Sequence, residues 1–146
     1  MPISATYSKL FIIPSSAIDE NGHVNNVAYV QWMQDIAVEH YASLDGVEAQ
    51  GQDATWFVHE HKIEYLLPAF IGEEIEIRTW VENIRRVRSL RKYEFVRRSD
   101  GKVLVRGETD WVFVDAKTGR PLAIPEKVRK VFLVSVGQGG IPPDHG

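Results

Sequence analysis

Residues 27–46 read VAYVQWMQDIAVEHYASLDG, and their apolar side chains recur with the period of an α-helix. The apolar face contains Tyr29, Trp32, Met33, Ile36, Ala37, His40, Tyr41 and Leu44. Asn25 or Asn26 can cap the N-terminus of this helix, and Gly46 can adopt the left-handed conformation that ends it. The pattern therefore predicts one amphipathic helix of about four turns.

The sequence on both sides of this helix is typical of β-strands separated by turns. The predicted strands are residues 6–13, 54–67, 73–84, 88–98 and 102–115, and a short helix is predicted at residues 125–132. One helix cannot cover both faces of an extended sheet, so this order favours an α+β fold. We expect an antiparallel sheet of about five strands that wraps around the long helix.

The composition is that of one ordinary globular chain. Its 146 residues predict a single domain, residues 1–136, followed by a flexible tail at residues 137–146. The formal net charge of −3 does not suggest a nucleic-acid partner. The absence of cysteine excludes disulfides and thiolate nucleophiles and is compatible with the cytoplasm, where we expect the protein. No apolar stretch approaches the ~20 residues that cross a membrane.

Two histidines on one predicted strand are potential metal ligands. His59 and His61 flank Glu60, so alternation along a strand would place both imidazoles on one face. A metal site needs at least one further ligand, and the sequence indicates none. We therefore predict neither a metal nor another cofactor.

Residues 19–26, DENGHVNN, place several polar groups directly before the helix. A carboxylate (Asp19), a carboxamide (Asn21) and an imidazole (His23) alternate here, and Gly22 permits tight backbone geometry. The N–H groups at a helix N-terminus favour negative charge that develops nearby. Together these groups suit hydrolysis of an acyl bond, which needs an activated oxygen and donors for the oxyanion. The same residues are also typical of an ordinary turn followed by a helix cap.

The segment DENGHVNNVAYVQW (residues 19–32) resembles the motif D-x-x-G-H-V-N-N-x-x-Y-x-x-W of hotdog-fold thioesterases. That family includes the 4-hydroxybenzoyl-CoA thioesterase-like proteins and the acyl-ACP thioesterases. Two weaker blocks, residues 57–75 and 87–95, follow in the order that the family has. The resemblance implies a hotdog fold and hydrolysis of acyl-CoA or acyl carrier protein thioesters in fatty acid metabolism. It also implies a homodimer or homotetramer with the site between subunits.

The resemblance assigns roles to several residues of the motif. Asp19 occupies the position of the family's catalytic carboxylate and would act as nucleophile or as general base on water. The backbone N–H of Asn26 occupies the position of an oxyanion donor. Gly22 and Tyr29 would contact the substrate, and Tyr29 with Trp32 would wall the acyl tunnel.

The spacing of Asp19, Asn21 and His23 also resembles the D-x-N-x-H signature of acyl-ACP thioesterases. In that branch a glutamate on the following strand completes the catalytic set, and Glu64 matches it. Asn21 and His23 would then orient the carboxylate, the water or the thioester carbonyl. Many relatives have a further aspartate where this chain has Ala17, so the bracing of the Asp19 loop is left open.

Residues 85–92, RRVRSLRK, form the densest basic run of the chain. Such a run is usually a solvated hairpin end. In the resembled family the matching place can contact the phosphates of coenzyme A, and guanidinium forks suit phosphate. Arg86 and Arg88 are therefore the predicted contacts, and an acidic carrier protein could dock on the same run.

Two other functions fit parts of the pattern. The hotdog fold also hosts hydratases and dehydratases of acyl thioesters, but the G-H-V-N-N block resembles a different motif from theirs. A non-catalytic acyl-CoA binding module would have no need of Asp19, Asn21, His23 and Glu64. We therefore expect a thioester hydrolase.

Overall fold

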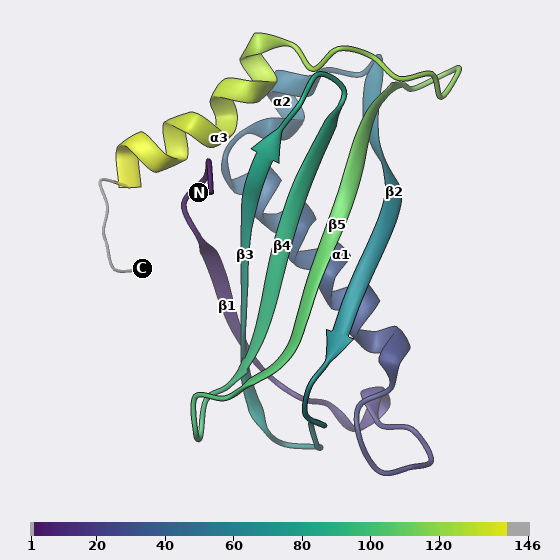
Figure 1. Cartoon of the computed structure of the whole chain (residues 1–146), viewed down its shortest axis with the longest axis vertical. Helices are drawn as coiled ribbons and strands as arrows, with labels where there is room; N and C mark the ends of the chain where they lie inside the picture. Colours follow the sequence, from purple (N-terminus) through teal and green to yellow (C-terminus); the bar gives the residue numbers. More distant parts are fainter. Residues whose placement is uncertain (1, 140–146) are drawn as a thin grey trace.

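The computed structural model describes residues 2–139, which form one antiparallel sheet and three α-helices (Figure 1). In chain order the elements are β1 (Tyr7–Ile12), the 3₁₀ helix η1 (Ser15–Ala17), α1 (Asn26–Ser43), α2 (Gly46–Gln50), β2 (Ala54–Tyr65), β3 (Glu74–Ile84), β4 (Arg88–Arg97), β5 (Val103–Asp115) and α3 (Glu126–Gly139). The strands lie in the order β1-β3-β4-β5-β2. This arrangement confirms the predicted α+β fold with five strands. Within the described range, none of the helices combines the length and the apolarity needed to cross a bilayer.

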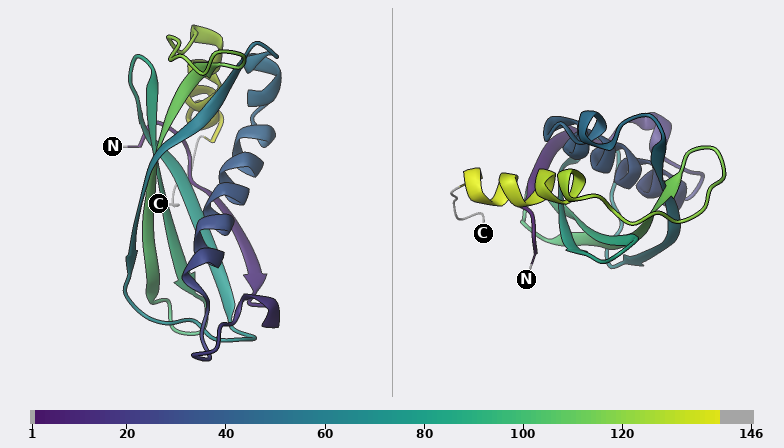
Figure 2. Two further views of the ribbon diagram at one scale, coloured as in Figure 1. Left: turned by 90° about the vertical axis from the view of Figure 1, so that its right-hand side faces the viewer. Right: turned by 90° about the horizontal axis from the view of Figure 1, so that it is seen from above.

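The sheet and α1 form two layers with the core between them. Figure 2 shows the curved sheet on one side and α1 lying along its inner face. Met33 and Ile36 of α1 are almost fully buried, and they share the core with Tyr93 and Phe95 of β4. The amphipathic face predicted from the sequence is thus the face that the sheet covers.

Alternation along the strands separates this inner face from an outer one. The inward positions of β3 are buried, and they are Ile75, Ile77, Thr79 and Val81. The outer face carries charged side chains. Glu94 of β4, for example, lies between two arginines of the neighbouring strands, Arg78 of β3 and Arg106 of β5. Each guanidinium group has a nitrogen 3.8 Å from one of the two Glu94 carboxylate oxygens.

The two ends of α1 are set by different residues. The side chain of Asn25 accepts a hydrogen bond from the Val27 N–H at 2.8 Å, which confirms the predicted cap. The prediction for the C-terminal end was wrong, because Asp45 adopts the left-handed conformation with φ 63°. Gly46 instead begins α2, and a side chain there would collide with the ring of Tyr41.

The C-terminal helix is longer than predicted. It begins after Pro125, as expected, but continues to Gly139 and not to residue 132. Val128 and Phe132 on its inner side are buried. The predicted tail at 137–146 therefore overlaps the end of α3, and residues 140–146 lie outside the described residues.

Candidate active site

Residues 18–24 fold into a small hairpin that presents Asp19. Ile18 and Val24 form an antiparallel bridge, and the Asp19 N–H donates to the His23 carbonyl oxygen at 3.0 Å. The Gly22 N–H returns to the Asp19 carbonyl oxygen at 3.0 Å, and Gly22 has φ +85°. A three-residue hairpin loop needs such a left-handed residue at its end, which explains the glycine. We call residues 18–24 the Asp19 hairpin.

The Asp19 carboxylate is partly held within this turn. Its Oδ1 accepts a hydrogen bond from the Asn21 N–H at 2.9 Å. The side chain is half-buried, and Oδ2 makes no hydrogen bond to any residue between 2 and 139. One carboxylate oxygen is thus fixed by the backbone while the other is free to bind water or substrate.

One backbone hydrogen bond joins the Asp19 hairpin to the rest of the fold, and a second joins the two residues that flank the hairpin. The Val24 N–H donates to the Ala69 carbonyl oxygen at 2.9 Å, and the Asn25 N–H donates to the Ala17 carbonyl oxygen at 2.8 Å. Val24 and Ala69 are both buried. Both are backbone bonds, so neither depends on a hydrogen-bonding side chain at position 17.

The first N–H groups of α1 lie directly after the hairpin. Asn25 satisfies two of them, since its side chain accepts from Val27 and its carbonyl oxygen accepts from Ala28. The N–H of Asn26 has no hydrogen-bond partner in the described part of the chain, and Asn26 is exposed. An exposed N–H without a partner among the described residues, at the positive end of an 18-residue helix, is suited to the oxyanion role expected for Asn26.

Two aromatic residues near the hairpin were not predicted. The Phe70 ring lies edge-on to His23, with ring centroids 6.5 Å apart. The Tyr65 hydroxyl lies 3.5 Å from the Asn26 carbonyl oxygen, a weak contact. Both aromatic residues are more than 40% exposed, so they form an apolar rim beside the polar groups.

Glu64, predicted to complete the catalytic set, lies in this chain on the other face of the sheet from the Asp19 hairpin. In the β2–β5 register Glu64 is opposite Arg106, whereas Ile63 is opposite Gly107. Gly107 faces α1, because a side chain there would come within 2.8 Å of the Met33 sulfur. Ile63 packs against the same core, so alternation directs Glu64 outward. Within one chain the sheet therefore separates Glu64 from the hairpin.

Arg86 and Arg88 lie at the β3–β4 turn, at the opposite end of the sheet from the hairpin (Figure 1). Arg88 Nη1 lies 3.0 Å from the carboxylate of Asp110, which also binds Arg85 at 3.1 Å. Arg86 is exposed, and its side chain makes no ion pair or hydrogen bond within residues 2–139. A single chain does not bring these guanidinium groups to Asp19, and Arg86 is the freer of the two.

Tyr29 is a core residue in this structure. Only 4% of it is exposed, and its ring meets those of Trp32, Tyr65 and Phe95 edge-on at 5.0–5.7 Å between centroids. Burial raises the pKa of its phenol to about 12, so the group stays neutral. Tyr29 therefore packs in the core beneath the start of α1, where its ring contacts other aromatic side chains.

The histidines of β2 do not form a metal centre. A β-bulge between Val58 and Glu60 interrupts the alternation that would place His59 and His61 on one face. His61 Nδ1 lies 2.9 Å from Thr109 Oγ1, toward α1. Across residues 2–139 no group of three histidine, cysteine, aspartate or glutamate side chains has metal-binding geometry.

Comparison with known proteins places this site in context. A family model described as the thioesterase-like superfamily matches residues 13–132. A candidate esterase of Caenorhabditis elegans is 25% identical over 118 residues, which cover 81% of this chain and 68% of that protein. Oleoyl-acyl carrier protein thioesterase 1 of Arabidopsis thaliana, a chloroplast protein, is 24% identical over 139 residues. That match covers 88% of this chain but only 38% of the plant protein.

The fold recurs in solved structures. A 1,4-dihydroxy-2-naphthoyl-CoA thioesterase from Synechocystis superposes with a TM-score of 0.78 at 15% sequence identity. The alignment covers 90% of this chain and 98% of the cyanobacterial one. At this level of identity the similarity establishes the shared hotdog fold.

Proposed function

Because the chain belongs to the thioesterase-like superfamily, we propose that it hydrolyses acyl thioesters at the Asp19 hairpin and the N-terminus of α1. The observation that supports this site most directly is the pairing of two features. The Asp19 carboxylate has one free oxygen, and the Asn26 N–H at the start of the next helix has no partner among the described residues. Hydrolysis of a thioester requires both kinds of group.

In the proposed reaction the Asp19 carboxylate activates water or itself attacks the thioester carbonyl carbon. The carbonyl oxygen gains negative charge, which the Asn26 N–H and the α1 dipole stabilise. The carbon–sulfur bond then breaks, and the products are a carboxylic acid and the free thiol of the carrier. Asn21 and His23 lie on the same hairpin and orient the water or the carbonyl group.

The carrier in this proposal is coenzyme A or acyl carrier protein, within fatty acid metabolism. The names of the plant and cyanobacterial proteins supply one example of each carrier. Arg86 is the better candidate for a phosphate contact, because Arg88 is already paired with Asp110. The lack of cysteine fits the cytoplasmic location that we propose, since disulfides are rare in reducing compartments.

The proposed assembly is a homodimer joined along β2. This strand forms a free edge of the sheet, and it exposes 50% of Phe57 and 45% of Tyr65. Exposed apolar edge strands are usually covered by another chain. Two-fold pairing would place the Ala54 end of one β2 beside the Tyr65 end of the other, and so bring Arg86 toward the partner subunit's hairpin. A homotetramer would pair two such dimers.

The test is thioester hydrolysis by the Asp19→Asn variant. Asparagine keeps the oxygen that accepts the Asn21 N–H and removes the charge, so the turn should persist. We expect kcat to fall by about 10²–10⁴-fold. Glu20→Gln is the matched control, because Glu20 is an exposed carboxylate in the same turn. Thiol release should be followed with a thiol-specific reagent, since a hydratase produces no free thiol.

The folded state of each variant should be checked by circular dichroism and urea unfolding. Wild-type turnover in a folded Asp19→Asn protein would overturn the proposed role of Asp19. A wild-type protein that binds acyl-CoA tightly and releases no thiol from any acyl-CoA or acyl carrier protein would overturn the hydrolase function itself.

A further inference from the structure

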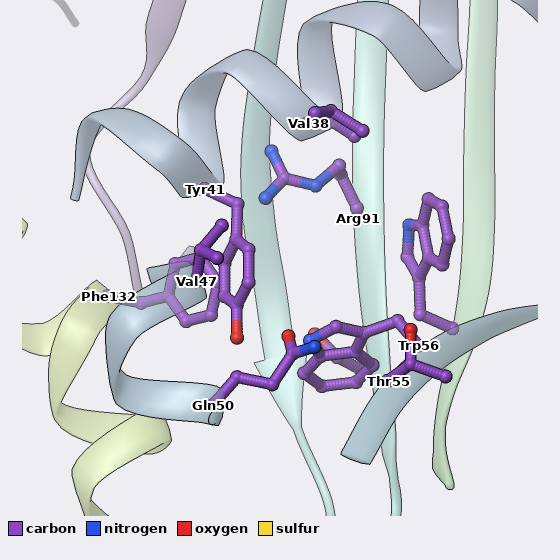
Figure 3. Close-up of a pocket in the computed structure, with 11 residues that line it drawn as sticks. Val38, Tyr41, Val47, Gln50, Thr55, Trp56, Arg91 and Phe132 are labelled. Atoms are coloured by element: carbon purple, nitrogen blue, oxygen red, sulfur yellow. The ribbon is translucent and has the colours of Figure 1, made fainter. Parts of the chain in front are cut away.

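A cavity of about 240 Å³ lies between the C-terminal half of α1, α2 and the inner face of the sheet. Figure 3 shows its aromatic walls together with Arg91. The aromatic side chains are Tyr41, Trp56, Trp111 and Phe132. Val38 of α1 lines the cavity and is 62% exposed, so the cavity is open to the surface beside it. The cavity lies far along α1 from Asn26 of the same chain, so it is separate from that chain's own hairpin.

Arg91 is the charged residue that lines this cavity. It is only 4% exposed, although a guanidinium group is strongly hydrated outside a protein. Nη1 donates to Nδ1 of His40 at 2.9 Å and to Oγ1 of Thr79 at 3.1 Å. Nε and Nη2 make no hydrogen bond to the described residues, which leaves one edge of the guanidinium fork unused.

The neighbours of Arg91 do not neutralise its charge. No carboxylate within residues 2–139 lies at ion-pair distance from it, and its guanidinium carbon lies 5.9 Å from the centroid of the Phe132 ring. Burial, together with the charge of Arg91, lowers the pKa of His40 to about 3, so the imidazole is neutral. Burial also lowers the pKa of Arg91, but only to about 10, so the guanidinium stays charged at neutral pH. An unpaired buried cation beside an empty apolar space is costly unless a ligand supplies an anion.

We propose that this cavity binds the far end of a short acyl group that carries a terminal carboxylate. Nε and Nη2 of Arg91 would donate to its two oxygens, and the aromatic walls would enclose the methylene segment. The volume is below the roughly 300–1,000 Å³ of sites for larger small molecules, which favours a short chain. The inference rests on the proposed function, because the thioester end would lie at the partner subunit's hairpin across the β2 edge.

The experiment compares glutaryl-CoA with pentanoyl-CoA, whose acyl groups have equal carbon counts and end in a carboxylate and a methyl group. We expect kcat/KM to be about 10- to 100-fold higher for glutaryl-CoA, as for hydrogen bonds to a charged group. Equal values, or a preference for pentanoyl-CoA, would overturn the inference and leave the hydrolase function intact.

Two arginine variants test whether Arg91 causes the preference for glutaryl-CoA over pentanoyl-CoA. Arg91→Met removes the charge at similar volume, and replacement of a buried charge by an apolar group is often tolerated. It should abolish the preference for glutaryl-CoA while pentanoyl-CoA is still hydrolysed. Arg98→Met is the matched control, because Arg98 is exposed on the β4–β5 turn, and it should keep the preference. A preference that persists in folded Arg91→Met would overturn the assignment.

Two further measurements cover the remaining outcomes. If Arg91→Met does not fold, Val38→Trp provides a second test, because a larger side chain at the opening should exclude the acyl group. We then expect a smaller preference for glutaryl-CoA. An unchanged preference would count against binding in this cavity. If neither thioester is hydrolysed, a panel of other acyl-CoA and acyl carrier protein thioesters tests the proposed function separately. The dissociation constants of the two thioesters then decide on the cavity alone, because equal affinities would overturn the inference.

Discussion

Acid should destabilise this fold through His40, the buried histidine that accepts a hydrogen bond from Arg91. His40 is 2% exposed, and its pKa in the folded chain is lowered to about 3 from the ordinary 6.5. Between these two pKa values the unfolded state binds more protons than the folded state. The free energy of unfolding therefore falls as the pH falls. Neutral His40 makes its full contribution to the free energy of unfolding above pH 6.5, its pKa in the unfolded chain. This contribution is lost progressively as the pH falls toward the lower pKa of His40 in the folded chain.

The size of this effect follows from the two pKa values. One group changes the free energy of unfolding by at most about 1.4 kcal/mol per pH unit. Between neutral pH and roughly pH 5, the ordinary pKa of 6.5 makes His40 responsible for a loss of about 2 kcal/mol. That is a substantial share of the roughly 5–15 kcal/mol that stabilises a typical domain.

The assay is urea unfolding at several pH values for the wild type and for His40→Asn. Asparagine offers Arg91 an oxygen acceptor and does not titrate, whereas all carboxylates are common to both proteins. The difference in free energy between wild type and variant should therefore shrink by about 2 kcal/mol from neutral pH to roughly pH 5. His59→Asn, at an exposed histidine, should follow the wild type. Parallel curves for wild type and His40→Asn would refute the reasoning.

Two further predictions concern packing and assembly. Gly46→Ala should lower the free energy of unfolding by about 1–3 kcal/mol, because the new methyl group would collide with the Tyr41 ring; unchanged urea unfolding would show that the ring moves aside freely. Val58→Lys on the β2 edge should halve the mass measured by light scattering and reduce thioester turnover, because charge on an edge strand opposes pairing. Leu10→Lys on the opposite edge strand β1 is the control and should stay dimeric. A wild-type protein that is monomeric in solution would contradict the proposed homodimer.

The strands were predictable because their signals are local. Alternation and turn residues predicted β3 and β4 to within one residue at each end, at Glu74–Ile84 and Arg88–Arg97. The β-bulge before Glu60 and the five-residue helix α2 have no comparable local signal. Asp45 took the left-handed position predicted for Gly46, and the glycine at position 46 is needed for another reason, because the Tyr41 ring leaves no room for a side chain there. That contact exists only in the folded chain.

The candidate site was predictable where one segment supplies it. Asp19, Asn21 and His23 share a hairpin, so a sequence motif describes their geometry directly. The motif did not indicate that Glu64 faces away from the hairpin within one chain. Its neighbour carried that signal, since an isoleucine at position 63 that packs in the core directs residue 64 outward. The role of Arg91 depends on packing among α1, α3 and the sheet, and in sequence it belongs to a basic run that reads as solvated.

The hydrogen bond from Val24 to Ala69 has a consequence for engineering this chain. The connection between β2 and β3 looks like a natural place for an inserted tag, a fused domain or new chain termini. Ala69 within it is 1% exposed and holds the hairpin that carries Asp19. Tolerance to insertion depends on the burial and bonding of the interrupted backbone. Insertions should therefore go to the β4–β5 turn at residues 99–101, which are exposed and hold no part of the site.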